Sequence, residues 1–371
     1  MKKKSPKILI CGGGTGGHVY SAIAIADALK KHLLEMDRPA KFLFIGAKDH
    51  MEMEKIPQAG YDIKGMWISA FPEKISKEAF VFLLKVINSY KESRKIIRSF
   101  CPDVVIGTGG YASGIPLCLA RSYKIPVFVQ EQNTRPGYTN IKVGGYCAKK
   151  VFVAFEEALV FFDKKKTIVT GNPIRSEFLS PLPSREEACQ KFGLNLDRPI
   201  ILSIGGSQGA RSINNGWVKG IKRLIERDIQ LLWQVGKSDF EKIRNNPGCQ
   251  HPNIHFKEFI NDMPMAYAAA DVVVSRAGGL AISELAVLGK FCLLIPLPWA
   301  SEDHQFRNAN AVVNKKAAFM IQNEEIDEKL IDTVIRMLNN QAMRQTLSKN
   351  ILTISMPNAA QTIAEEIINH L

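Results

Sequence analysis

Short apolar runs alternate with amphipathic stretches along most of this chain. Strands of a parallel sheet are covered on both faces, so they form continuous apolar runs, whereas amphipathic helices show a 3.6-residue spacing. Helical spacing, as from residue 21 to residue 34, separates the apolar runs. We therefore expect parallel sheets with right-handed crossovers. The clearest predicted strands are 7–11, 41–46, 102–107, 125–129, 167–169, 200–204, 231–236, 254–256 and 271–275.

The alternation occurs twice, which favours two similar domains over one large sheet. A chain of 371 residues exceeds what one hydrophobic core usually serves. Asp103-Val104-Val105-Ile106 before Gly109-Gly110 is echoed by Asp271-Val272-Val273-Val274 before Gly278-Gly279. We expect two Rossmann-like, doubly wound domains facing each other across a cleft, over residues 1–171 and 172–357. Met356-Pro357 interrupts the last helical region, so a final helix over 358–371 is expected to pack back on the first domain.

Two glycine-rich turns each follow an apolar strand and precede a predicted helix. The first is Gly12-Gly13-Gly14-Thr15-Gly16-Gly17-His18, and the second is Gly205-Gly206-Ser207-Gln208-Gly209. Glycine lets backbone amides approach an anion closely, and the start of a helix adds partial positive charge. The turns therefore predict phosphate binding, although a tight strand–helix turn that binds nothing has the same appearance.

The first turn also matches the dinucleotide fingerprint, because Gly12, Gly14 and Gly17 have its spacing. A nicotinamide dehydrogenase normally carries an acidic residue at the end of the second strand, where it holds the ribose. Here that strand ends in Gly46-Ala47-Lys48. We therefore disfavour a dehydrogenase.

Two residues beside these turns could carry chemistry. His18 lies at a predicted helix start, where the dipole disfavours the imidazolium and leaves a neutral base. Glu284 lies one turn into the helix after strand 271–275, where a carboxylate can accept hydrogen bonds from a ribose. A capping histidine and a solvent-facing glutamate are the alternatives.

The composition is that of a soluble protein with anionic partners. The formal charge is +13, but the basic residues are scattered without a nucleic-acid motif, so we expect no nucleic-acid partner. The seven cysteines show no zinc spacing and indicate a reducing compartment. No signal peptide or membrane-spanning segment is predicted, so a cytoplasmic location is expected, with peripheral membrane contact as an option.

One apolar segment, residues 80–87, lies among several lysines and arginines. If it is helical, its large side chains point in almost every direction. This combination predicts an interfacial membrane patch, for which the candidate residues are Phe80, Phe82, Leu83 and Lys85. A wholly buried helix is the alternative.

Several motifs occur together in a characteristic order. They are Gly-Gly-Gly-Thr-Gly-Gly-His, Gly-Thr-Gly-Gly-Tyr-Ala-Ser-Gly, Glu-Gln-Asn, Gly-Asn-Pro-Ile-Arg, Gly-Gly-Ser-Gln-Gly-Ala and Asp-His-Gln-x-x-Asn-Ala. With these motifs, the chain resembles the MurG family over essentially its whole length. MurG enzymes transfer N-acetylglucosamine (GlcNAc) from UDP-GlcNAc to lipid I, the undecaprenyl diphosphate-linked acceptor of cell-wall synthesis.

The reaction is expected to be a direct, inverting displacement by the 4-hydroxyl of the muramoyl residue, with His18 as the candidate general base. The resemblance implies a GT-B fold. It implies no cofactor and no metal, in keeping with the lack of an Asp-x-Asp motif. It also implies work at the cytoplasmic face of an anionic plasma membrane, with other cell-wall synthesis proteins as possible partners. Donor contacts are implied for Thr15, Gly16, Gly17, Asn133, Arg175, Ser207, Ile260, Leu280, Glu284, His304 and Gln305. Contacts to the acceptor diphosphate are implied for Gly13, Gly14, Gly109, Gly110 and Tyr111.

Overall fold

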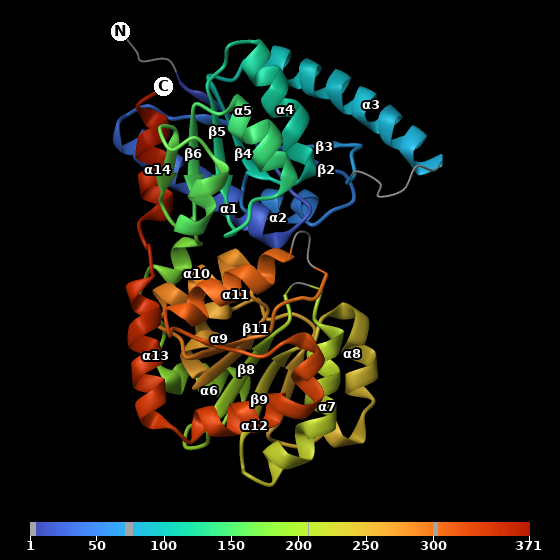
Figure 1. The fold of residues 1–371 in the computed structure, drawn as a ribbon, viewed down its shortest axis with the longest axis vertical. Coiled ribbons are helices and arrows are strands. Elements are labelled where there is room, and N and C mark those ends of the chain that lie inside the picture. Colours follow the sequence, from blue (N-terminus) through green and yellow to red (C-terminus); the bar gives the residue numbers. More distant parts are fainter. Residues whose placement is uncertain (1–4, 71–76, 207, 300–302) are drawn as a thin grey trace. The chain divides into compact units, whose positions relative to one another are not determined.

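The chain forms two compact units, each built on one parallel sheet with helices on both faces (Figure 1). Unit 1 comprises Met1–Arg175 and Met356–Leu371, and unit 2 comprises Ser176–Ser355. The structure is a computed structural model that describes residues 5–70, 77–206, 208–299 and 303–371, with 77–79 as backbone only. The prediction of two doubly wound parallel sheets is confirmed.

The sheet of unit 1 has seven strands in the order β3-β2-β1-β4-β5-β6-β7. Its strands are β1 (Lys7–Gly12), β2 (Lys41–Ala47), β3 (Ile63–Met66), β4 (Val104–Gly109), β5 (Val127–Glu131), β6 (Lys150–Val153) and β7 (Thr167–Val169). Its helices are α1 (Gly16–Glu35), α2 (Glu52–Gln58), α3 (Lys77–Phe100), α4 (Tyr111–Ser122), α5 (Gly145–Cys147) and α14 (Ala359–Ile368), with the π-helical turn η1 (Thr139–Gly144) and the 3₁₀ turn η2 (Glu156–Phe161).

Alternate residues of β1 supply the two cores of unit 1. Leu9 and Cys11 belong to the cluster on one face of the sheet, and Ile8 and Ile10 belong to the cluster on the other. All four are fully buried, as the continuous apolar run predicts. Burial also raises the pKa of the Cys11 thiol, so this cysteine is a small core residue.

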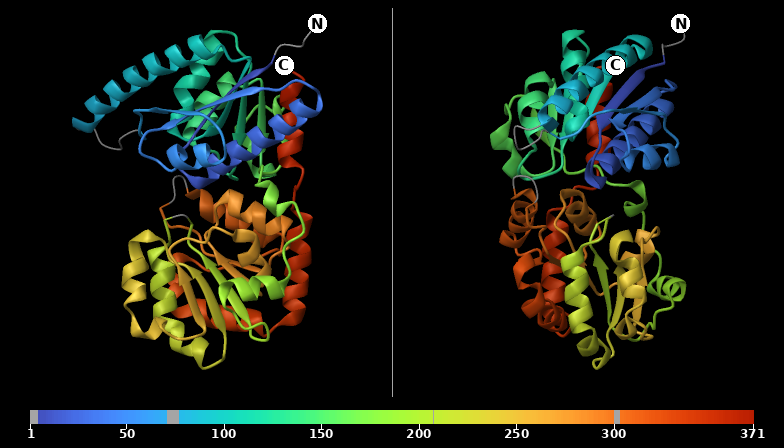
Figure 2. Two further views of the ribbon diagram at one scale, coloured as in Figure 1. Left: turned by 180° about the vertical axis from the view of Figure 1, so that it is seen from behind. Right: turned by 90° about the vertical axis from the view of Figure 1, so that its right-hand side faces the viewer.

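The C-terminal helix α14 packs against α1, although more than 300 residues separate them in sequence (Figure 2). Ile363, Ala364 and Ile367 are buried in the same cluster as α1. Asn358, the residue at which the final helix is expected to begin, is the cap residue of α14.

The sheet of unit 2 has six strands in the order β10-β9-β8-β11-β12-β13. Its strands are β8 (Ile200–Ile204), β9 (Gln230–Gln234), β10 (Ile254–Lys257), β11 (Val272–Ser275), β12 (Cys292–Leu294) and β13 (Phe319–Met320). Its helices are α6 (Arg185–Phe192), α7 (Arg211–Ile225), α8 (Lys237–Arg244), α9 (Met263–Ala269), α10 (Gly279–Val287), α11 (His304–Asn314), α12 (Ile326–Leu338) and α13 (Gln341–Thr353), with the 3₁₀ turns η3 (Ser176–Phe178), η4 (Pro247–Cys249) and η6 (Asn323–Glu325).

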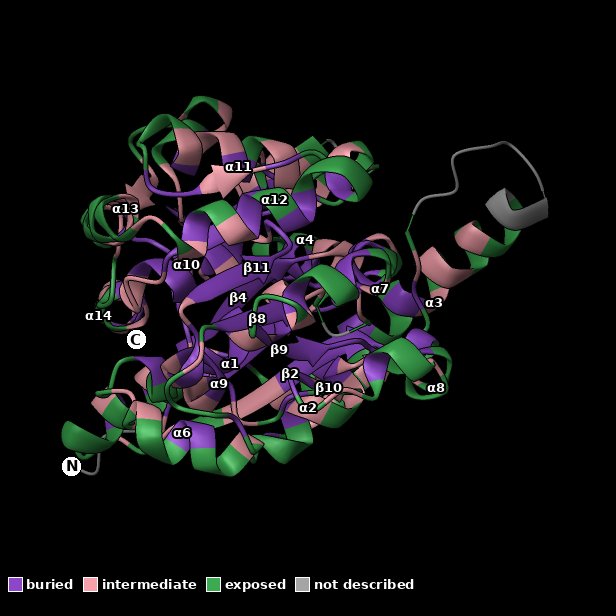
Figure 3. Ribbon diagram, turned by 90° about the horizontal axis from the view of Figure 1, so that it is seen from below, coloured by how far each residue is buried: buried purple, intermediate pink, exposed green. Residues whose placement is uncertain are grey.

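The core of unit 2 surrounds two fully buried tryptophans, Trp217 on α7 and Trp233 on β9. The strands β9 and β11 of this unit are buried along their whole length (Figure 3). Each indole N–H has a partner inside the core, which removes the cost of burying an unpaired donor. The Trp217 indole donates to Ser203 Oγ at 2.8 Å, and that of Trp233 donates to Asn214 Oδ1 at 3.0 Å.

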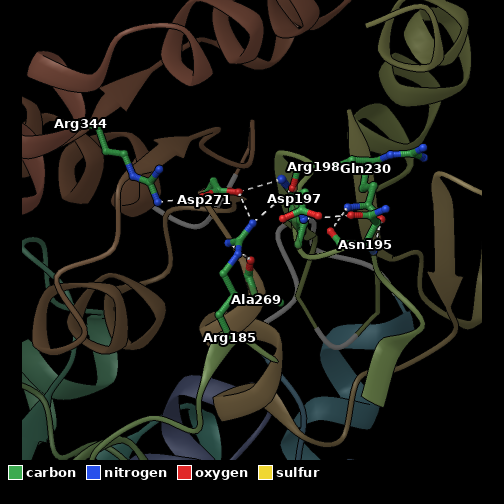
Figure 4. A network of polar contacts seen from close by, with 9 residues as sticks. Arg185, Asn195, Asp197, Arg198, Gln230, Ala269, Asp271 and Arg344 are labelled. Atoms are coloured by element: carbon green, nitrogen blue, oxygen red, sulfur yellow. Dashed lines mark hydrogen bonds and ion pairs between the residues drawn. The ribbon is translucent and has the colours of Figure 1, made fainter. Parts of the chain in front are cut away.

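One aspartate in each unit joins two central strands at their amino-terminal ends. Asp103 Oδ2 accepts the Lys7 amide at 2.8 Å, and Asp271 Oδ2 accepts the Ile200 amide at 2.9 Å. The sequence echo between Asp103 and Asp271 therefore corresponds to the same hydrogen bond in both sheets. Asp271 also forms ion pairs with Arg185 and Arg344, each at 2.9 Å (Figure 4).

The nine expected strands are all present, with ends shifted by up to two residues. Four further strands, β3, β6, β12 and β13, were not expected. They have two to four residues each, and their pairing with a neighbouring strand makes them strands.

The ion pairs of Asp271 with Arg185 and Arg344 predict that a substitution at Asp271 destabilises unit 2 strongly. We expect Asp271→Asn to lower the free energy of unfolding by about 2–3 kcal/mol, because Arg185 loses its largely buried partner. Urea titration followed by tryptophan fluorescence, to which the buried Trp217 and Trp233 contribute, would measure this. Asp332→Asn, which removes an exposed ion pair with Arg223, is the control and should leave the midpoint almost unchanged. Equal effects of the two changes would contradict the role of Asp271.

Candidate active site

The first glycine-rich turn joins β1 to α1 and places His18 in the first turn of that helix. Thr15 is the N-cap residue, with an extended backbone, and its hydroxyl accepts the His18 amide at 3.5 Å. A hydroxyl at this position caps a helix, so the helix start is fixed by Thr15 and not by His18. The His18 imidazole is therefore not the helix cap, which was the alternative that the sequence alone left open.

The imidazole of His18 is held by the turn itself. Its Nδ1 lies 2.9 Å from the carbonyl oxygen of Gly13 and 3.1 Å from Thr15 Oγ1. A carbonyl oxygen can only accept, so this geometry assigns the proton to Nδ1 and the lone pair to Nε2. Nε2 is then the nitrogen that can accept a proton from a substrate.

The second loop of unit 1 follows β4, the neighbour of β1, and packs directly against His18. Gly109 and Gly110 have φ angles of +99° and +77°. A Cβ at Gly109 would lie 2.9 Å from His18 Nε2, and one at Gly110 would lie 2.3 Å from the Gly13 carbonyl oxygen. Only glycine allows this approach. In this sheet the crossovers change direction between β1 and β4, which is where ligands bind in open α/β sheets.

Tyr111, the first residue of α4, closes this edge together with a histidine that sequence reasoning missed. The Tyr111 hydroxyl lies 2.9 Å from His50 Nε2. Burial, with a smaller effect from the charge of Glu52, raises the pKa of the Tyr111 phenol. His50 lies in the turn after β2 and has no motif of its own, so only the fold connects it with Tyr111.

A buried carboxylate, Glu52, lies behind the first turn and was also missed. Its side chain is completely buried, and it accepts the Gly14 amide at 3.1 and 3.2 Å and the Ala47 amide at 3.0 Å. We expected the Gly14 amide to face an acceptor diphosphate. It donates instead to Glu52, a side chain of the protein itself. Acidic residues in the first turn of a helix are usual, so no sequence signal distinguishes Glu52.

Asn133 follows β5 and lies at the same carboxyl-terminal edge of the sheet. Its backbone amide and its side-chain amide both donate to Glu131 Oε1, at 2.9 and 3.1 Å, and Asn140 donates to Glu131 Oε2 at 2.8 Å. Burial raises the pKa of Glu131 despite these hydrogen bonds. Within the Glu-Gln-Asn motif, Glu131 therefore orients Asn133 by these hydrogen bonds. Arg175, at the end of this unit's first segment, has its guanidinium 4.9 Å from the centroid of the Tyr20 ring.

In unit 2 the second glycine-rich turn joins β8 to α7. Ser207 lies outside the described residues. Gln234, at the end of β9, connects this turn to the loop that carries Ile260: its Nε2 donates to the Gly206 carbonyl and its Oε1 accepts the Ile260 amide, each at 2.9 Å. Gln234 is almost completely buried and fixes the two loops relative to each other. Sequence reasoning missed it, because a glutamine ending an apolar strand carries no motif.

The helix that follows β11, the neighbour of β8, carries Leu280 and Glu284. Each side chain is 7% exposed, so Glu284 is not the solvent-facing glutamate that its sequence position also allowed. His304 and Gln305 open α11, which packs against α10. Gln305 Oε1 accepts the Leu297 amide at 2.9 Å and so ties α11 to the loop after β12.

The structure therefore gathers the predicted residues into one group in each unit. Unit 1 brings together the first turn, His18, Gly109 to Tyr111 and Asn133. Unit 2 brings together the second turn, Ile260, α10 and the start of α11. Within the described ranges, no cluster of three or more histidine, cysteine or acidic residues could hold a metal ion.

The predicted membrane patch lies on α3, which extends beyond the rest of unit 1 in Figure 1. Phe80 is 66% exposed and Leu83 is 53% exposed, which contradicts a wholly buried helix. The other two predicted patch residues, Phe82 and Lys85, are half-buried. Lys85 Nζ donates to Ser69 Oγ at 3.0 Å beside the Trp67 ring. We call the exposed residues Phe80, Val81, Leu83, Leu84 and Ile87 the α3 apolar surface. No helix among the residues described is long and apolar enough to cross a bilayer.

Comparison with known proteins identifies two family models along the chain. Residues 8–153 match the glycosyltransferase family 28 N-terminal domain, and residues 200–365 match the glycosyltransferase family 28 C-terminal domain.

Curated proteins are similar over almost the full length. A protein of Flavobacterium psychrophilum named UDP-N-acetylglucosamine–N-acetylmuramyl-(pentapeptide) pyrophosphoryl-undecaprenol N-acetylglucosamine transferase is 44% identical, over 98% of this chain and 97% of the relative. A protein of the same name from Christiangramia forsetii is 43% identical over 98% of each chain. The crystal structure of Acinetobacter baumannii MurG superposes with a TM-score of 0.73 at 25% identity, over 98% of this chain and 99% of that one. These likenesses confirm the GT-B fold class.

The close approach of the two loops at Gly110 predicts that one added methyl group at this position lowers the stability of unit 1 strongly. We expect Gly110→Ala to destabilise unit 1 by more than the roughly 1 kcal/mol that a left-handed helical backbone costs an alanine, because its φ of 77° with a ψ of 165° is adopted almost only by glycine and its Cβ also meets the Gly13 carbonyl. Gly60→Ala is the matched control, since Gly60 has a φ of +82° and nothing within 4 Å of its Cβ position. Chemical denaturation of both variants would measure the difference. Similar losses would show that the two loops do not restrain each other.

Proposed function

This chain belongs to the family of UDP-N-acetylglucosamine–N-acetylmuramyl-(pentapeptide) pyrophosphoryl-undecaprenol N-acetylglucosamine transferases, and on that premise we propose how its residues carry out the transfer. The enzyme moves GlcNAc from UDP-GlcNAc to the 4-hydroxyl of the muramoyl residue of lipid I. The observation that carries this function is identity above 40% along 98% of the chain with proteins of that name.

We propose that His18 is the general base. The acceptor hydroxyl gives its proton to Nε2 while its oxygen attacks the anomeric carbon of GlcNAc. The bond from that carbon to the UDP oxygen breaks, and its electron pair leaves with UDP. Attack from the side opposite the leaving group converts the α-linked donor into a β-linked product. The Nδ1–H···O bond to Gly13 supports this role, because it leaves the lone pair on Nε2.

We propose that unit 2 stabilises the negative charge that develops on the UDP diphosphate. Backbone amides of the turn after β8 and the amino-terminal end of α7 can stabilise it without moving during the reaction. Glu284 would hold the ribose hydroxyls and Ile260 the uracil, and Arg175 would lie near the diphosphate. The remaining proposed donor contacts are Thr15, Gly16, Gly17, Asn133, Ser207, Leu280, His304 and Gln305.

For the acceptor diphosphate we propose the two loops of unit 1, with Gly13, Gly14, Gly109, Gly110 and Tyr111 as the contacts. The Gly14 amide already donates to Glu52. The amino-terminal ends of α1 and α4 therefore supply most of the attraction in this proposal, because both helices begin directly after these loops.

We further propose that the enzyme works at the cytoplasmic face of the plasma membrane, held through the α3 apolar surface. Supporting this, large apolar side chains are exposed in one place on a chain with a formal charge of +13. Basic proteins are attracted to anionic lipid, and exposed apolar groups then enter the interface.

The activity and the base can be tested in one assay. With UDP-GlcNAc and a lipid I analogue, the wild-type enzyme should form the disaccharide product and UDP. His18→Ala should lower kcat by about 10²–10⁴-fold, the usual contribution of a positioned base, with UDP-GlcNAc binding largely kept. Absence of transfer by the wild type would reject the acceptor assignment, and near-normal turnover of the variant would reject the base.

Membrane attachment can be measured by flotation with liposomes that contain anionic lipid. We expect the double change Phe80→Ser and Leu83→Ser to lower the bound fraction severalfold, because two exposed apolar side chains leave the interface. Val160→Ser is the control, since Val160 is 77% exposed in the same unit but belongs to η2 and not to α3. Unchanged flotation of the double variant would remove the α3 apolar surface from the proposal.

A further inference from the structure

One peptide group separates a buried carboxylate from His18. The N–H of the Gly13–Gly14 peptide donates to Glu52, at 3.1 Å to Oε1 and 3.2 Å to Oε2. The C=O of the same peptide accepts from His18 Nδ1 at 2.9 Å. Carboxylate, peptide and imidazole therefore form one continuous hydrogen-bonded chain.

Glu52 is fixed at the far end of this chain. It is the first residue of α2, and its Oε1 also accepts the Ala47 amide at the end of β2, at 3.0 Å. A Cβ at Gly13 would lie 2.0 Å from Glu52 Oε1, and one at Gly46 would lie 2.6 Å from Glu52 Cγ. Two glycines thus make room for this side chain. Burying a carboxylate is costly unless hydrogen bonds satisfy it, and here backbone amides do so.

We infer that Glu52 is a positioning residue for His18 and acts on it through the Gly13–Gly14 peptide. A carboxylate that accepts a peptide N–H polarises that peptide and makes its carbonyl oxygen a stronger acceptor. The stronger acceptor holds the proton on Nδ1 and stabilises the imidazolium that forms when Nε2 takes the proton of the acceptor hydroxyl. In serine hydrolases an aspartate accepts this Nδ1–H directly. In this protein the Gly13–Gly14 peptide lies between the Glu52 carboxylate and the His18 imidazole.

This inference rests on the proposed role of His18 as base, but its consequences can be measured separately. A purely structural Glu52 would hold α2 and β2 beside the turn and affect every property of unit 1 alike. A Glu52 that acts through His18 changes the imidazole tautomer and kcat, and it leaves the binding of UDP-GlcNAc almost unchanged.

The experiment uses the full-length enzyme with Glu52→Gln, which keeps the shape of the side chain but removes the charge and one acceptor oxygen. We expect kcat to fall about 10–100-fold, the range found for residues that orient metal-binding histidines, with the KM for UDP-GlcNAc within about twofold of wild type. In the His18→Ala background the same change should produce no further loss, because the group on which it acts is absent.

A spectroscopic measurement needs no substrate. Nitrogen-15 NMR of the imidazole should show His18 with its proton on Nδ1 in the wild type, and a mixture of the two tautomers in Glu52→Gln. Tyr61→Phe is the control for a general loss of stability, since it removes a hydrogen bond to Asp27 in the same unit. It should leave both kcat and the tautomer unchanged. If Glu52→Gln does not fold, Glu52→Asp is the second variant. Its shorter side chain keeps the charge but moves it away from the Gly14 amide, so it should also give a mixture of the two His18 tautomers.

The outcomes separate this inference from the proposed function. A wild-type tautomer in the Glu52 variants, or an equal loss of kcat in the His18 and His18→Ala backgrounds, would overturn the positioning role. Near-normal turnover of His18→Ala would instead reject the base, and the tautomer measurement would still report whether Glu52 controls the imidazole.

Discussion

The site in unit 1 depends on the contact between two main-chain loops at the ends of neighbouring strands. β1 and β4 run side by side, so the loops that follow them meet at one edge of the sheet. Gly109 and Gly110 approach closely enough for the His18 ring to lie between the loops, and a single Cβ at either position would occupy the space of the ring or of the Gly13 carbonyl. The orientation of His18 therefore follows from backbone packing, and its own side chain has little freedom to change it.

Unit 2 uses the same arrangement with different side chains. β8 and β11 are neighbours, and the loops after them carry the glycine-rich turn and the helix with Glu284. A buried side chain, Gln234, joins the turn to the Ile260 loop, because an amide can donate to one loop and accept from the other. Preorganised loops of this kind suit a reaction in which charge develops on a bound diphosphate.

Acidic side chains are used differently at the two edges of the sheets. At the amino-terminal edges, Asp103 and Asp271 accept strand amides and hold adjacent strands in register. At the carboxyl-terminal edge of unit 1, Glu52 and Glu131 are buried and bind the amides of the loops that carry the proposed site residues. The first pair stabilises the sheets. The second pair fixes loop conformation, which a bound substrate would otherwise have to order.

The sequence by itself determined the long strands, the two parallel sheets, the glycine-rich turns and the family, because apolar runs and motifs are local properties of the chain. It also singled out His18 and Glu284, since each lies at a fixed offset from a turn or strand. Only the tertiary structure decided that Glu284 is buried and that the α3 apolar surface is exposed, because burial depends on what other segments cover. Glu52, His50 and Gln234 could not be found from the sequence. Their partners, Gly14, Tyr111 and Ile260, are between 26 and 61 positions away, and only the folded sheets bring them within hydrogen-bonding distance.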